Sequence, residues 1–92
     1  MRTFRISVTQ TIDITVDDTK FDSCFMSEFR QYFFPFETIE QHAKHLAQLQ
    51  ARGIHDLSPY ASEFVEGYGP SHDMGIKGVV RSTDIEFEAE VA

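Results

Sequence analysis

The chain has 92 residues, a net charge of −7, nine phenylalanines and one cysteine, which suits a single domain over residues 1–92 with one apolar core. The negative charge excludes simple capture of free DNA or RNA, because such binding needs Lys and Arg side chains that neutralise phosphates. The single Cys24 excludes an intramolecular disulfide, and the sequence has neither an apolar run of roughly 18 residues nor a signal-peptide layout, so we expect a cytoplasmic protein without a membrane span.

The N-terminal segment predicts a long strand over residues 3–16. From Phe4 to Val16 the even positions are apolar except for Gln10, and the odd positions are polar. Alternation with this period places the apolar side chains on one face of a sheet. The break at Gln10 is a position where a bulge would be tolerated.

Segment 21–34 predicts a helix, which begins after an Asp or Thr N-cap and ends before Pro35. Its apolar side chains have helical spacing and form one face: Phe21, Cys24, Phe25, Phe29, Tyr32 and Phe33. We therefore expect Cys24 to be a small buried side chain rather than a nucleophile.

A second helix is predicted from a capping box, in which Thr38 caps the helix and Gln41 reaches back to it. It runs to about Arg52, and Gly53 suits the left-handed residue that follows a helix end. Its apolar face consists of residues at helical spacing: Ile39, Ala43, Leu46 and Leu49.

The segment after the second helix is rich in turn residues. A short helix is expected near residues 59–66, because Pro59 suits the first helical position. Residues 76–82 predict a strand and residues 84–92 predict another, with a bend or turn at 82–84 between them.

This order of elements predicts an α+β fold: a small, mostly antiparallel three-stranded sheet with two main helices and one short helix packed on one face. The apolar sides of the strands would then be buried under the helices. The other face would be open to solvent, with Thr9, Asp13 and the carboxylates of the last strand on it.

The last predicted strand alternates carboxylates with apolar residues, so one of its faces would carry a row that we call the acidic strand: Asp84, Glu86, Glu88 and Glu90. Alternate strand residues lie about 6 to 7 Å apart, close to one nucleotide step of an extended backbone. Such a row would neutralise Lys and Arg side chains that normally hold phosphates. Alternatively, it keeps the strand soluble and guards its edge, or pairs in part with Arg5 across the sheet.

Residues 41–55, which include most of the second helix and the turn after it, contain no acid. We call the following residues the basic ridge: Arg30, Lys44, Gln48 and Arg52. The last three follow helical spacing, with Gln41 on the same stripe, and Arg30 extends the ridge from the preceding helix. The ridge suits phosphate or ribose contacts, or an acidic protein surface, and a solvated helix face is the alternative.

An enzyme interpretation lacks a convincing site. His42 and His45 are three residues apart on one helix, and His55 or His72 would have to supply a third metal ligand. His42 also lies between apolar neighbours, so a packing histidine is the better interpretation. We therefore expect no catalysis, no metal and no cofactor.

The two-helix block 28–53, placed behind the strand 4–16 and ahead of segment 64–78, is similar to a small phage protein, and the whole chain resembles the anti-CRISPR proteins, in particular the type I-F inhibitors. The resemblance covers most of the chain. It implies a non-enzymatic inhibitor that binds the type I-F RNA-guided surveillance complex (Cascade) and blocks target DNA binding. In that case the acidic strand faces Lys or Arg side chains of Cas proteins, and the basic ridge faces guide RNA or an acidic protein patch. The inhibitor is then expected to be a monomer.

Two alternatives stay open from the sequence. One is a homodimeric structural or regulatory phage accessory protein, which would use the open sheet face or the edge of the N-terminal strand. The other is a small metalloenzyme built around the histidines named above.

Overall fold

The computed structural model describes residues 1–91 as two long strands and two helices, with a small hairpin between α2 and the last strand. In chain order the elements are β1 (Thr3–Thr15), the 3₁₀ turn η1 (Asp18–Lys20), α1 (Ser23–Tyr32), α2 (Ile39–Ala51), β2 (Phe64–Val65), β3 (Gly69–Pro70), the 3₁₀ turn η2 (Ser71–Met74) and β4 (Lys77–Val91). No helix in these 91 residues has the length and apolar character needed to cross a membrane.

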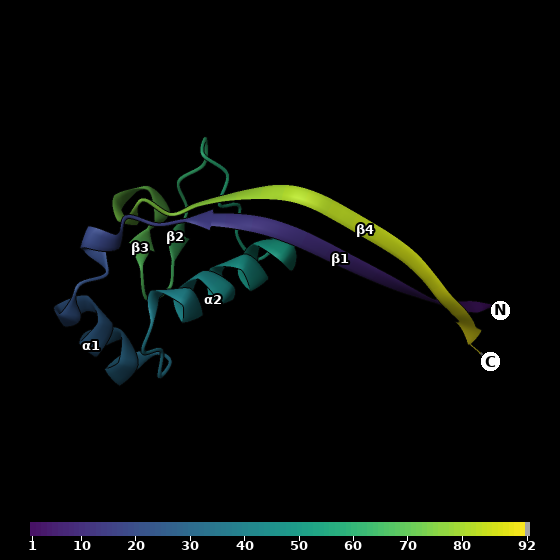
Figure 1. Cartoon of the computed structure of the whole chain (residues 1–92), viewed down its shortest axis with the longest axis horizontal. Coiled ribbons are helices and arrows are strands. Elements are labelled where there is room, and N and C mark those ends of the chain that lie inside the picture. The colour runs from purple at the N-terminus through teal and green to yellow at the C-terminus, as the bar shows by residue number, and fades with distance from the viewer. Residues whose placement is uncertain (92) are drawn as a thin grey trace.

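Figure 1 shows β1 and β4 leaving the helices together as one curved ribbon, which makes the molecule elongated, with extents of 52 × 29 × 19 Å. We call residues 17–76 the helical body. Residues 3–9 and 84–91, which lie beyond the helices, are the distal ribbon.

The ribbon is one antiparallel pair, from Thr3 opposite Val91 to Thr15 opposite Lys77. The predicted break at residues 82–84 is wrong, because β4 continues through it and the register shifts only at two bulges. Ser82 and Asp84 are compatible with a turn, but without Gly or Pro beside them they do not force one. β1 continues unbroken next to this segment, so β4 stays paired with it. The last residue of the predicted strand, Ala92, lies outside the described residues.

The predicted three-stranded sheet is also wrong: the α+β class is confirmed, but the four strands form two sheets of two strands each, β1 with β4 and β2 with β3. β4 runs unbroken from Lys77 to Val91, so the two predicted C-terminal strands are one strand, and the short strands β2 and β3 pair with each other. The expected short helix at 59–66 does not form, because the backbone of Ser71 donates to Glu63 O at 2.8 Å and holds this segment as a hairpin. Gly67, with a φ of 91°, makes the turn.

α2 begins where the sequence predicts, whereas α1 begins at Ser23, two residues later than predicted, with Asp22 as its N-cap in place of an Asp or Thr before Phe21. The Asp22 side chain caps α1 by accepting from Phe25 N at 2.8 Å, and the capping box of Thr38 and Gln41 is formed at the start of α2. Gly53 follows α2 with a φ of 70°, as expected for a left-handed residue.

The core lies in the helical body and combines both helices with the residue Phe21 before α1 and with segments that follow α2: Phe21, Met26, Phe29, Leu46, Leu57, Val65, Tyr68 and Ile76. The ribbon contributes only its base, where Ile14 and Val16 pack against this cluster. Cys24 is exposed, so the prediction of a buried thiol is wrong. Met26 and Phe29 define the inward side of α1, and Cys24, two residues before Met26, lies on the far side of the helix.

The base of the ribbon is covered by α2. Ile12 and Ile14 are half-buried there, and Gln50 Nε2 donates to Gly78 O at 3.5 Å. A Cβ atom at position 78 would lie 1.8 Å from Gln50 Oε1, so a larger residue here would displace the end of the Gln50 side chain. The prediction that helices bury the apolar face of the sheet is therefore confirmed only for the base of the ribbon.

Candidate functional site

The apolar face of the distal ribbon is uncovered. Paired residues of an antiparallel ladder share a face, and the pairs Ile6–Phe87 and Val8–Ile85 put four apolar side chains on the same face as Phe4. These five residues, which we call the apolar ribbon face, are between 46% and 74% exposed. The alternation of these residues is as predicted from the sequence. Their predicted burial under the helices is wrong, because the helices end before they reach this part of the ribbon.

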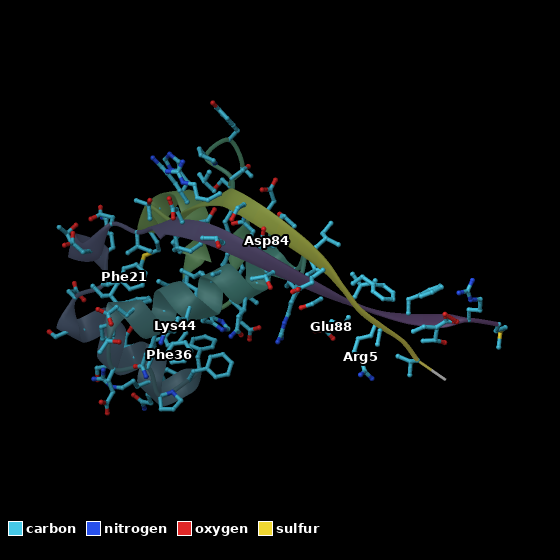
Figure 2. All side chains as sticks on the ribbon, turned by 45° about the vertical axis from the view of Figure 1, so that its right-hand side comes forward. Arg5, Phe21, Phe36, Lys44, Asp84 and Glu88 are labelled. Atoms are coloured by element: carbon cyan, nitrogen blue, oxygen red, sulfur yellow. The ribbon has the colours of Figure 1, made fainter. Side chains whose placement is uncertain are left out.

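The acidic strand is divided by a bulge. Ser7 lies opposite Glu86 and Thr9 opposite Asp84, so these two carboxylates do share the open polar face, as predicted. The register then shifts between Arg5 and Ile6, which leaves Glu88 without a partner position in the ladder. Figure 2 shows Asp84 over the middle of the ribbon and Glu88 further out, toward Arg5.

Beyond the bulge Glu90 lies opposite Phe4, on the apolar ribbon face, so the prediction of one face for all four carboxylates is wrong. Its carboxylate accepts two hydrogen bonds from the Arg2 guanidinium, at 2.9 and 2.8 Å. This pairing lowers the pKa of Glu90 below its usual range. Arg2 also lies over the Phe4 ring, 5.1 Å from its centroid. Glu90 is thus engaged within the chain, whereas Asp84, Glu86 and Glu88 make no hydrogen bond or ion pair with residues 1–91 through their side chains.

The basic ridge borders a hollow on the exposed side of α2. The hollow has a volume of about 280 Å³ and is lined by Phe36, Gln41, Lys44, His45 and Gln48. Figure 2 shows the Phe36 ring next to the position of Lys44 on the helix. The site therefore combines an ammonium, two amides and an aromatic ring, which is the chemistry used to hold a phosphate, a ribose and a stacked base.

Two ridge residues lie apart from this hollow. Arg52 is the C-cap of α2, one turn beyond Gln48, and Arg30 is exposed near the end of α1. The sequence does not predict Phe36 as a contact residue, and it indicates His45 only as a possible metal ligand. Phe36 follows Pro35 in the loop between α1 and α2, where its ring lies against α2. His45 contacts that ring, with centroids 5.5 Å apart.

The histidines do not converge on a metal. His42 is fully buried, and its Nδ1 is 2.8 Å from the Tyr68 hydroxyl. Burial lowers the pKa of His42 to about 4, so the ring is neutral at pH 7, and burial also raises the pKa of Tyr68. Within residues 1–91 no three His, Cys, Asp or Glu side chains are grouped closely enough to hold a metal ion. The three-histidine centre that the metalloenzyme alternative requires is not formed, and His42 is the packing residue that its apolar neighbours predicted.

No protein-family model matches the chain, and neither a curated protein nor a solved structure is significantly similar to it. The fold and the surfaces described above are therefore the basis on which a function is assigned.

Proposed function

We propose that this protein is a non-enzymatic inhibitor of the anti-CRISPR kind, which binds a type I-F RNA-guided surveillance complex and blocks its access to target DNA. The observation that carries the proposal is the projection of Asp84, Glu86 and Glu88 on a narrow ribbon that stands clear of the body, where their carboxylates have no partner among residues 1–91. The resemblance in size and pattern to the type I-F inhibitors supports the choice of target.

The distal ribbon supplies the blocking surface. A channel that holds target DNA is lined with Lys and Arg side chains, and carboxylates at strand spacing match the interval of the phosphates that these side chains hold. A net charge of −7 further favours rapid association with a basic surface. A projecting ribbon of two strands fits a narrow channel better than the wider helical body does.

The hollow beside the basic ridge supplies a second contact. Lys44 offers a charge to a phosphate, Gln41 and Gln48 offer amides to a ribose, and Phe36 offers a ring for stacking. This combination suits a nucleotide of the exposed guide RNA. An inhibitor with both contacts would bind the loaded complex and not free nucleic acid, in keeping with its charge.

The test is a competition between the protein and a labelled target duplex for purified type I-F surveillance complex, read by mobility shift. The wild-type chain should prevent duplex binding at near-stoichiometric amounts. The combined Glu86→Lys and Glu88→Lys substitution should weaken inhibition about tenfold or more, because two attractive contacts become repulsive.

The matched control is Glu37→Lys, an exposed carboxylate that precedes α2 and lies outside the acidic strand. It changes the charge by the same amount per site and should leave inhibition within about twofold of wild type. Equal losses at Glu37 and at the ribbon would contradict the assigned surface. Failure of the wild-type chain to bind the complex would contradict the function itself.

A further inference from the structure

The outer edge of β1 is open along its whole length. The Gly78 N–H donates to Leu57 O at 2.6 Å, away from β1, so Gly78 and its partner Ile14 form a pair without mutual hydrogen bonds. The even-numbered residues of β1 therefore direct their N–H and C=O groups away from β4. Across residues 1–91 no backbone or side-chain group of the chain bonds to this edge.

An open edge of this kind needs a partner. Two strands alone are marginally stable in water, and a third strand or a covering layer is usually required. Here the distal ribbon has neither, since α2 covers only its base. The edge of β1 is also long, regular and rich in β-branched residues, which makes it a template for another strand.

The residue types of β1 are symmetric about Thr9. Positions at equal distances on the two sides of Thr9 match as follows: Val8 with Gln10, Ser7 with Thr11, Ile6 with Ile12, Arg5 with Asp13, Phe4 with Ile14 and Thr3 with Thr15. Apolar residues thus face apolar residues, hydroxyls face hydroxyls, and the single cation faces the single anion. Only the pairing of Val8 with Gln10 is mixed. Such a strand is complementary to an antiparallel copy of itself.

We propose that this chain forms a symmetric homodimer, in which β1 pairs antiparallel with β1 of a second copy about a two-fold axis at Thr9. The result is one four-stranded sheet in the order β4, β1, β1, β4. This register lets the outward groups of the even-numbered residues form about twelve backbone hydrogen bonds between the copies. The resulting interface is isologous, so each contact between the copies occurs twice.

Three contacts fix this register. Arg5 lies opposite Asp13 of the second copy, and shifting the centre by one residue in either direction loses this pair. The pair is available because Arg81 bonds Asp13 Oδ2, and Oδ1 accepts no hydrogen bond from the described part of the chain, residues 1–91. Phe4 and Ile6 of one copy come beside Ile14 and Ile12 of the other, where α2 already provides an apolar layer.

The β4 edge does not suit the same association. Its distal half carries Asp84, Glu86 and Glu88, and antiparallel copies of it would bring like charges together. In the proposed dimer these carboxylates lie on the two outer edges of the sheet. The acidic strand and the hollow on α2 both stay outside the interface, but the sheet becomes four strands wide in the dimer. The dimer is therefore argued from the β1 edge alone and is tested separately from the proposed inhibitor function. It differs from the monomer that the sequence resemblance implied.

Sedimentation equilibrium of the full chain tests the proposal, together with two matched proline variants. Val8→Pro removes an outward N–H from the β1 edge, and Ile85→Pro, at the position paired with Val8, removes one from the β4 edge. Neither N–H contributes to the bonds between β1 and β4. Wild type and Ile85→Pro should sediment as dimers, and Val8→Pro as a monomer with unchanged circular dichroism.

A charge exchange tests the register without a backbone change. In an Arg81→Gln background, which removes the intramolecular partner of Asp13, either Arg5→Asp or Asp13→Arg should raise the dimer dissociation constant about tenfold. The double variant restores both pairs with reversed sign and should return to within about threefold of the background. A wild-type chain that stays monomeric up to millimolar concentration, a dimeric Val8→Pro variant, or a double variant weaker than both single variants would overturn the proposal.

Discussion

The helical body buries its apolar side chains, whereas the distal ribbon leaves its apolar side chains exposed. Leu46 and Leu57 in the body are 0% exposed, whereas Val8 and Ile85 in the ribbon are 61% and 74% exposed. Both regions are built from similar residue types. The difference arises because the two helices and the hairpin enclose a volume, while two strands alone have no second layer to pack against.

This contrast separates two kinds of role. The body encloses its own core and needs no other molecule to bury it. The ribbon presents apolar and acidic side chains in a defined order but buries few of them, which is typical of a surface that other molecules contact. Substitutions in the body should therefore change stability, and substitutions in the ribbon should change association.

Truncation of one leucine or isoleucine in each region gives the largest expected difference. Leu46→Ala should lower the free energy of unfolding by about 2 to 5 kcal/mol, because it leaves a cavity in a fully buried site. Ile85→Ala should change it by less than about 0.5 kcal/mol, since that side chain already lies in water. Urea unfolding of both variants measures the two values, and similar losses would mean that the ribbon is packed in solution.

The body should also lose stability in mild acid. The unfolded chain protonates His42 near pH 6.5, whereas the folded chain does so only near its pKa of about 4. The unfolded state therefore binds more protons, and stability should fall as the pH drops from 6.5 to 4, by up to about 1.4 kcal/mol per pH unit. Urea unfolding at several pH values measures this slope.

Two histidine variants test which group causes the dependence of stability on pH. His42→Gln should remove the larger part of it, with a remainder from His45, whose pKa is also lowered by burial. His72→Gln, at a histidine whose side chain is 82% exposed, is the matched control for the loss of an imidazole. An unchanged slope in His42→Gln would show that carboxylates, and not this histidine, cause the acid sensitivity.

The junction between body and ribbon should be sensitive to a single methyl group. Gly78→Ala should cost about 1 to 3 kcal/mol, because the new Cβ displaces the Gln50 side chain where α2 meets β4. In a Gln50→Ala background the same change should cost markedly less. A double-mutant cycle by urea unfolding measures this coupling, and additive losses would argue against the close contact.

The smallest effect is expected at Cys24. Cys24→Ser should change the free energy of unfolding by less than about 0.5 kcal/mol, because the thiol is exposed on the far side of α1. The native wild-type chain should also react with a thiol reagent at the rate of a free thiol. Slow labelling that requires unfolding would show that Cys24 is buried in the core.

Local signals in the sequence predict much of the fold. Capping by Thr38 and Gln41, the left-handed Gly53 and the alternation of β1 are each decided by a few neighbouring residues, and all three are confirmed. The errors concern longer distances. The bulge at Glu88 depends on how β4 meets β1, and the exposure of the apolar ribbon face depends on where α2 ends.

The features of the candidate site likewise fall into those that local sequence predicts and those that depend on contacts between distant elements. Strand and helix periodicity fix side-chain direction within one element, so the alternation of carboxylates along β4 and the shared side of a cation and amides on α2 can be read from the sequence. Contacts between elements bring Glu90 to Arg2, place Phe36 and Lys44 at one hollow and leave the edge of β1 open. These outcomes depend on which elements meet in space, and no periodicity within a single strand or helix encodes that choice.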